Sequence, residues 1–171
     1  MSENIHYEDS YFQISSDNAD DRYITSTDAV MVVPLTEKGE VILIREPSPA
    51  FNELVLMLPG GTIDANENPR VSANRELQEE IDLKARTLNL LCQFRPWTKY
   101  LKIEIFVYLG RNLVDSPLEG DEGHIITTQH VPLNQFEQYI ASGELRDSTK
   151  ISAFYMTRQF LRYEKSLHNG H

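Results

Sequence analysis

Runs of apolar residues about the length of a β-strand dominate the first three quarters of the chain. They occupy residues 29–35, 40–46, 54–58, 88–94, 101–109 and 124–133. Within the run 101–109, Ile103, Ile105 and Val107 take alternate positions, as in a half-exposed strand. The segment Thr36–Gly39 separates the first two runs and is typical of a turn, which predicts a β-hairpin there.

A helical period replaces the strand pattern between residues 69 and 81. Ala73, Leu77 and Ile81 recur every four residues and predict a helix with one buried face. Pro69 suits the first turn of that helix, and Asn68 before it is a candidate N-cap.

The ends of the chain differ from its middle. Residues 133–143 and 148–165 predict two further helices, the first of which ends near Gly143. Residues 1–26 are polar and rich in aspartate, with short possible strands at 11–14 and 23–24. That N-terminal segment is either disordered or an arm that pairs with the main sheet or with a partner subunit. We therefore expect one α/β domain over 27–165, with helices layered on a mixed sheet, and a tail over 166–171.

Acidic residues gather on the helix predicted at 69–81. Glu76 and Glu80 are four residues apart and project from the same face, with Glu79 beside them. Like charges at this spacing repel, and Arg75 can offset only part of the cluster. A divalent cation would offset the rest. Oxygen ligands without histidine or cysteine favour Mg²⁺, or Mn²⁺, over zinc.

Residues 61–83, with the sequence GTIDANENPRVSANRELQEEIDL, resemble the Nudix box of enzymes that hydrolyse nucleoside diphosphates linked to another group. The residues that match the family pattern in register are Gly61, Glu67, Arg75, Glu76, Leu77, Glu79, Glu80 and Leu83. Asp82 stands where the family has a glycine, at the end of the helix, and aspartate tolerates the left-handed backbone better than most residues. The resemblance implies the Nudix α/β/α sandwich with a mixed β-sheet.

The resemblance also implies a role for each residue of the box. The carbonyl of Gly60 and the carboxylates of Glu76 and Glu80 would be ligands of Mg²⁺. Glu79 would bind a further ion or orient a metal-bound water, which makes it a candidate catalytic residue. In the layer behind the ligands, Glu67 and Arg75 would keep these glutamates in place through ion pairs and hydrogen bonds.

Segments outside the box resemble the branch of the family that contains ADP-ribose pyrophosphatases and ADP-compound hydrolases. These segments are residues 41–46 and 118–122. In that branch an acidic loop carries the catalytic base, and Glu122 is the candidate here. Glu119, Asp121 and His124 are the alternatives. Arg45 and Arg95 are candidates to bind substrate phosphates, because guanidinium groups suit bidentate contacts with such oxygens, although either could be a structural ion-pair partner.

The predicted reaction is Mg²⁺-dependent hydrolysis of ADP-ribose, or a related ADP-linked compound, to AMP and a phosphorylated product. Hydrolysis of dinucleoside polyphosphates or of NADH by the same site is a second possibility. A third is a non-catalytic sensor of such ligands, although a sensor would be expected to have lost box glutamates. By resemblance we expect a homodimer.

Composition narrows the partners and the location. The 171 residues are enough for one domain and carry a net charge of −10, which argues against binding nucleic acid or an anionic membrane surface. Cys92 is the single cysteine, so no disulfide can form within the chain. The sequence shows no signal region and no apolar stretch of membrane-spanning length, so we expect a cytoplasmic protein.

Overall fold

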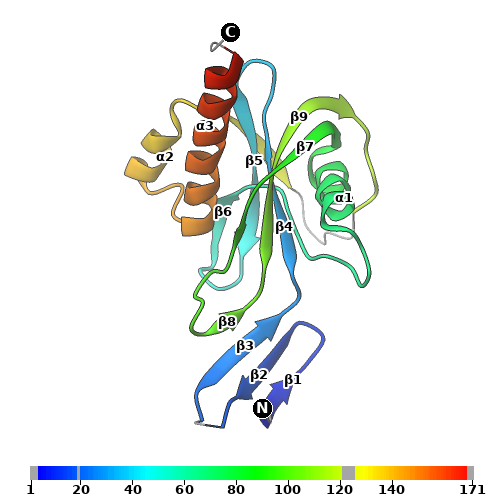
Figure 1. The fold of residues 1–171 in the computed structure, drawn as a ribbon, viewed down its shortest axis with the longest axis vertical. Helices are drawn as coiled ribbons and strands as arrows, with labels where there is room; N and C mark the ends of the chain where they lie inside the picture. The colour runs from blue at the N-terminus through cyan, green and yellow to red at the C-terminus, as the bar shows by residue number, and fades with distance from the viewer. Residues whose placement is uncertain (1–3, 19, 121–125, 169–171) are drawn as a thin grey trace.

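The computed structural model describes residues 4–18, 20–120 and 126–168, and it arranges them as helices on two sides of central strands (Figure 1). The strands are β1 (Asn4–Glu8), β2 (Phe12–Ser16), β3 (Arg22–Ser26), β4 (Ala29–Pro34), β5 (Glu40–Ser48), β6 (Glu53–Met57), β7 (Leu83–Phe94), β8 (Leu101–Lys102), β9 (Ile105–Asp115) and β10 (Thr127–Pro132). The helices are α1 (Pro69–Ile81), α2 (Phe136–Ser142) and α3 (Ser148–His168). No helix in these ranges is long and apolar enough to cross a membrane.

Two three-stranded sheets form the centre of the molecule. One has the order β4–β9–β7, with β4 parallel to β9 and β7 antiparallel to it. The other has the order β10–β5–β6 and is antiparallel throughout. The predicted mixed arrangement of strands is therefore confirmed.

The hairpin predicted between residues 29–35 and 40–46 is wrong. The turn itself forms, with the Gly39 amide donating to the Thr36 carbonyl at 3.0 Å. Beyond the turn, β4 and β5 share a single bridge, between Leu35 and Val41, and enter different sheets. Residues 30–34 of β4 and 41–44 of β5 are buried. Each strand forms its backbone hydrogen bonds over a longer stretch with another strand, β4 with β9 and β5 with β10. Both strands therefore become interior strands of their sheets or lie beside one, where apolar side chains are covered.

Side chains of β4 alternate between two hydrophobic cores. Val30 and Val32 face the core beneath α1, which also contains the predicted stripe of Ala73, Leu77 and Ile81. Met31 and Val33 face the second core, which contains Phe136 of α2 and Phe154 of α3. Helix α1 and the pair α2 and α3 therefore cover opposite faces (Figure 1), as the α/β/α expectation required.

The two C-terminal helices follow the predicted pattern with shifted ends. Helix α2 begins at Phe136, because residues 132–135 form a turn, and it ends at Gly143 with φ of 80°, as predicted. Helix α3 continues to His168 and so passes residue 165, where the domain was expected to end. The division of the chain into 1–26, 27–165 and 166–171 stays a prediction.

The N-terminal segment is a small sheet of its own. Strands β1, β2 and β3 pair antiparallel, and β3 pairs in parallel with β8 from the β7–β9 connection. The described part of this segment is thus an arm that pairs with the body of the molecule. The predicted strand 101–109 is interrupted, because β8 ends at Lys102 and β9 begins at Ile105. Each part pairs with a different sheet.

Candidate active site

Helix α1 begins and ends as its sequence predicts. The Asn68 side chain accepts a hydrogen bond from the Arg70 amide at 2.9 Å, and Pro69 lies in the first turn. Asp82 follows the last turn with φ of 60°, in the left-handed region, and its amide donates to the Leu77 carbonyl. The aspartate therefore closes the helix in the conformation that glycine favours at this position.

Arg75 lies at the centre of the acidic cluster. Its Nη1 donates to Glu76 at 2.8 Å and to Glu79 at 2.9 Å. Its Nη2 donates to Glu67 at 3.2 Å and to the Thr62 carbonyl at 3.0 Å. One guanidinium thus joins three carboxylates to the loop that precedes the helix.

Charge on this cluster is stabilised by its internal contacts. Burial alone would raise the pKa of Glu67, but hydrogen bonds from Arg75 and Ser72 outweigh burial and lower that pKa below its ordinary value of 4.5. Burial of Arg75 opposes its charge, yet hydrogen bonds to Glu67 and the negative charge of Glu76 raise the pKa of the guanidinium above its ordinary value. Both groups are therefore charged at neutral pH.

The turn at residues 59–61 brings the backbone against two of the glutamates. The Gly60 amide donates to Glu80 at 2.9 Å. A Cβ atom added at Gly61 would lie 2.5 Å from a carboxylate oxygen of Glu76, and one added at Gly60 would lie 2.3 Å from the Val30 carbonyl. Backbone atoms leave no room for a side chain at Gly60, so glycine is required there, whereas a side chain at Gly61 would displace the Glu76 carboxylate.

Strand β4 holds this turn in place. The carbonyls of Pro59 and Gly61 accept hydrogen bonds from the amides of Val32 and Val30, at 2.8 and 2.9 Å. The carbonyl of Gly60 between them accepts no backbone hydrogen bond from the described residues. Whether this carbonyl binds a metal ion stays a prediction.

The donor set suits a hard divalent cation. Glu76 and Glu80 are buried and supply carboxylate oxygens, and among the described residues no histidine or cysteine contacts them. Over the described residues, no three acidic, histidine or cysteine side chains converge closely enough to surround an ion. Arg75 lies between Glu67, Glu76 and Glu79 instead.

The loop that follows β9 packs against the C-terminal end of α1. The Ser116 amide donates to the Asp82 carbonyl at 2.9 Å, and the Leu118 amide donates to the Gln78 carbonyl at 3.1 Å. A Cβ atom at Gly120 would lie 3.3 Å from the Cβ of Glu79. The chain is thus beside the glutamate cluster immediately before residue 121. Three candidates for the base (Asp121, Glu122 and His124) lie outside the described residues, and Glu119 is exposed.

The two arginines predicted to bind substrate lie in different settings. Arg45 donates to Glu144 at 2.8 Å and to Gln129 at 2.9 Å, so its guanidinium is an ion-pair partner between β5, β10 and the end of α2. Arg95 is exposed and donates to Glu104 at 2.6 Å. It lines a pocket of about 600 Å³ between the small N-terminal sheet and the β7–β9 connection.

Three contacts of the site were not predicted. Ser72 is fully buried and donates to Glu67 at 2.6 Å. The Gln78 side chain donates to Ser116 at 2.9 Å and so ties α1 to the acidic loop. The carbonyl of Thr62 accepts from Arg75. The sequence could have indicated Ser72, because it is a polar residue directly before Ala73 of the predicted buried stripe. The contacts of Gln78 and Thr62 depend on loop conformation.

Comparison with known proteins shows what the whole chain resembles. The family model described as NUDIX domain matches residues 25–151. The ADP compounds hydrolase NudE of Escherichia coli is 28% identical over 138 residues, which cover 81% of this chain and 74% of that protein. The ADP-ribose pyrophosphatase of Bacillus subtilis is 24% identical over 141 residues, with the same coverage. A crystal structure of an ADP compounds hydrolase superimposes with a TM-score of 0.80 at 23% identity and covers 96% of both chains, which shows the same fold.

Proposed function

Because the chain belongs to the Nudix family, we propose that it hydrolyses the diphosphate bond of ADP-ribose, or of a related ADP-linked compound, to AMP and a phosphorylated product. The observation that carries this proposal is the cluster of three glutamates around Arg75, with Glu80 beside it against the turn at Gly60 and Gly61. Relatives named as an ADP compounds hydrolase and an ADP-ribose pyrophosphatase support the substrate class.

Nudix hydrolases generally use divalent metal ions, and the proposal assigns Mg²⁺, with Mn²⁺ as a substitute. Glu76, Glu80 and the Gly60 carbonyl would hold the ion, and Glu79 would hold a second ion or orient a water molecule. A bound cation supplies charge neutralisation at the diphosphate oxygens and a more acidic water. Arg75, itself held by Glu67, would position Glu76 and Glu79 through the hydrogen bonds described above, and the Gly60 amide would position Glu80.

Glu122 is the proposed general base, which accepts the proton of the attacking water. The position of Gly120 against Glu79 supports this role, because it brings the chain to the cluster two residues before Glu122. Glu119, Asp121 and His124 remain the alternatives.

Arg95 is the stronger of the two candidates for a phosphate contact. Arg95 also has an ion-pair partner, Glu104, but its side chain is 68% exposed and lines a pocket, so a substrate anion can reach it. Arg45 already pairs with Glu144 and also donates to Gln129. A substrate contact at Arg45 would require at least one of these bonds to break.

The proposal includes a homodimer in the cytoplasm. Four large apolar side chains of the small N-terminal sheet are more than half exposed, namely Ile5, Tyr7, Tyr11 and Phe12. An exposed apolar sheet face of this kind supports contact with a second copy. The single cysteine and the acidic composition support the cytoplasm.

A substrate panel tests the reaction. ADP-ribose, an ADP-sugar, a dinucleoside polyphosphate, NADH and a nucleoside triphosphate are incubated with Mg²⁺, and AMP release is measured by chromatography. We expect the highest kcat/KM for ADP-ribose or the ADP-sugar. A clear preference for the dinucleoside polyphosphate or NADH would replace the substrate class. No turnover of any compound, together with tight binding of ADP-ribose, would favour a sensor.

A further inference from the structure

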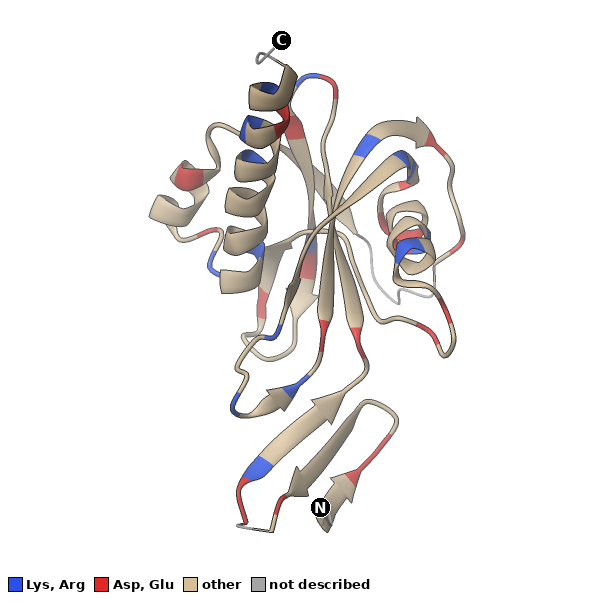
Figure 2. Cartoon of the chain, viewed as in Figure 1, with Lys and Arg blue, Asp and Glu red and all other residues tan. Residues whose placement is uncertain are grey.

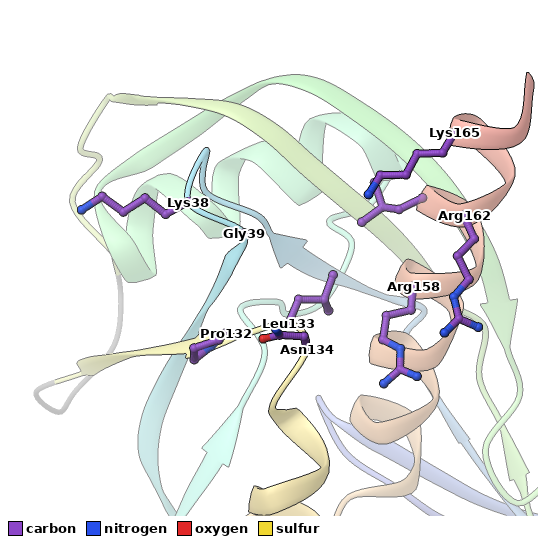
Figure 3. Close-up of a pocket in the computed structure, with 9 residues that line it drawn as sticks. Lys38, Gly39, Pro132, Leu133, Asn134, Arg158, Arg162 and Lys165 are labelled. Carbon is purple, nitrogen blue, oxygen red and sulfur yellow. The ribbon is translucent and has the colours of Figure 1, made fainter. Parts of the chain in front are cut away.

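A second pocket, of about 540 Å³, opens on the side of the molecule that α3 covers (Figure 3). It lies between α3, the turn that joins β4 to β5, and the end of β10. Helix α3 packs on the opposite face from α1 (Figure 1). The pocket is thus separate from the glutamate cluster, and its volume falls within the range of about 300–1,000 Å³ that is usual for small-molecule sites.

The lining of this pocket is basic although the chain is acidic. Four of its nine lining residues are cations and none is an acid, whereas the whole chain has 26 acidic residues against 16 basic ones. Figure 2 shows basic residues along α3 in the same region. The remaining lining residues are small, apolar or, at Asn134, a neutral hydrogen-bonding side chain. Such a lining favours an anion.

Three of these cations follow one another along α3. Arg158, Arg162 and Lys165 are spaced by four and three residues, which places them on one face of the helix (Figure 3). Cations at this spacing repel one another and weaken the helix unless an anion lies between them. Lys38 also lines the pocket, but its side chain points away from α3 in Figure 3, so the α3 cations carry the argument.

Among the described residues, Arg158 has side-chain partners, whereas Arg162 and Lys165 have none. Arg158 pairs with Glu137 and lies over the rings of Phe136 and Tyr155, at 5.2 and 5.5 Å, which fixes its position. Arg162 and Lys165 make no ion pair or hydrogen bond with the described residues, and both are exposed.

The nearest acid along the helix does not neutralise this pair of cations. Glu164 lies between Arg162 and Lys165 in the sequence, but both of its oxygens accept from Arg111, at 2.8 and 2.9 Å. The positive charge of Arg162 and Lys165 is therefore uncompensated among the residues that the structure describes.

We propose that this pocket binds a small anion that carries two or more linked phosphate groups. Arg162 and Lys165 are free to contact such an anion, and Arg158, which stays paired with Glu137, extends the row of positive charge over seven residues, a rise of about 10 Å along a helix. A single phosphate can lie against only part of this row, whereas a chain of phosphates can follow it. Arginine suits bidentate contacts with phosphate oxygens, and the amide of Asn134 offers a further donor. This site does not depend on the hydrolase reaction proposed above.

Titration with inorganic tripolyphosphate tests the proposal. The full chain is titrated calorimetrically in a chelator without divalent cations, so that the glutamate cluster has no metal through which to bind phosphate. We expect saturable binding of one equivalent per chain that weakens with added salt. Orthophosphate should bind at least about tenfold more weakly, because it makes fewer charged contacts. Equal affinity for the two would overturn the assignment to linked phosphates.

A matched pair of variants locates the site. R162Q/K165Q removes one arginine and one lysine from the pocket, and K84Q/R86Q removes the same charges from exposed positions on β7. We expect R162Q/K165Q to weaken tripolyphosphate binding by about tenfold or more and K84Q/R86Q to change it less than about twofold. Equal losses in both variants would show a nonspecific charge effect and would overturn the proposal, as would no saturable binding by the wild type.

Two further measurements complete the test. Circular dichroism should show that R162Q/K165Q folds and melts as the wild type does, because the substitutions remove like charges from one helix face. ATP in place of tripolyphosphate then distinguishes the source of the phosphate chain. Equal affinity means that the phosphates alone are recognised, and tighter binding of ATP adds a nucleoside contact; both outcomes support the site. Loss of tripolyphosphate binding only in an unfolded R162Q/K165Q protein would shift the test to R162Q alone, which must then show the loss.

Discussion

Helices α1 and α3 lie on opposite faces of the same sheet and differ in the burial and pairing of their charged side chains. On α1, Glu76 and Glu80 are buried, and Arg75 makes hydrogen bonds to three carboxylates. On α3, Arg162 and Lys165 are exposed and have no partner within the described residues. Buried charges persist only when they are paired, whereas exposed charges can remain hydrated.

This contrast separates two kinds of site. The α1 cluster is a network in which the position of each group depends on its neighbours, so a single substitution should disturb several groups together. The α3 cations act more independently, and their removal should affect only what binds there. The following experiments are expected to affect the α1 side strongly and to leave the α3 side unchanged.

The largest effect is expected for Glu80→Gln. The amide side chain can still accept the hydrogen bond from the Gly60 amide, so the fold should persist while the charge is lost. We expect kcat to fall on the order of 10³-fold, as when one key electrostatic contact is removed. Steady-state AMP release measures the effect, with Glu37→Gln in the exposed β4–β5 turn as control. Unchanged turnover in Glu80→Gln would remove Glu80 from the metal site.

A smaller loss is expected when the proposed base is replaced. Glu122→Gln should lower kcat by about 10²-fold, the lower end of the range for general base catalysis. His124→Ala is the comparison variant, and kcat against pH is the measurement. Full activity in Glu122→Gln with loss of activity in His124→Ala would transfer the role of base to His124.

Arg75→Ala should reduce both activity and stability. It removes the hydrogen bonds to Glu67, Glu76 and Glu79 and leaves carboxylates close together without their cation. We expect activity to fall by about 10- to 100-fold and the free energy of unfolding to fall by about 2 kcal/mol. Urea denaturation and turnover measure the two effects. R162Q/K165Q serves as the α3 control and should leave turnover unchanged.

Glu67 should make the stability of the protein depend on pH. Its pKa is lower in the folded chain than the ordinary 4.5, so its stabilising contribution is fully present above that value and is lost as the pH falls through the lower folded pKa. Glu67→Gln should therefore lower the melting temperature at pH 7 and have less effect in acid. An equal effect at both pH values would show that the charge of Glu67 does not matter.

The smallest effect is expected for Asp82→Gly. Asp82 has a left-handed backbone, which glycine adopts without strain from a Cβ atom. We expect the free energy of unfolding to rise by about 0.5 kcal/mol with unchanged turnover. Thermal melting measures the change. A lower melting temperature would mean that the aspartate side chain contributes more than its backbone strain costs.

Local patterns predicted the bounds and the buried face of α1 in detail. The cap at Asn68, the buried stripe and the end at Asp82 all depend on residues within a few positions of one another. The match of the family model to residues 25–151 confirms the Nudix resemblance. The helices that cover both faces of the central strands confirm the α/β class. Short-range signals were sufficient because the backbone hydrogen bonds of a helix join residues four positions apart.

The sequence patterns did not predict which strands pair over long distances along the chain. The apolar runs at 29–35 and 40–46 looked like a hairpin, yet each strand pairs with a segment far along the chain. Strand partners are decided by the whole sheet, and neighbouring runs with a good turn between them satisfy the local rules equally well. The α3 pocket could not be predicted for the same reason, since it combines residues 38, 132–134 and 158–165.

Strand β4 fixes the position of the turn at residues 59–61. One of its edges pairs with β9, and amides on its other edge bind the Pro59–Gly61 turn. Because side chains alternate with a period of two, a slip of one residue would exchange the contents of the two cores and carry the turn away from Glu76 and Glu80. Inserting one residue between positions 29 and 34 should therefore abolish hydrolysis even though every acidic group is retained.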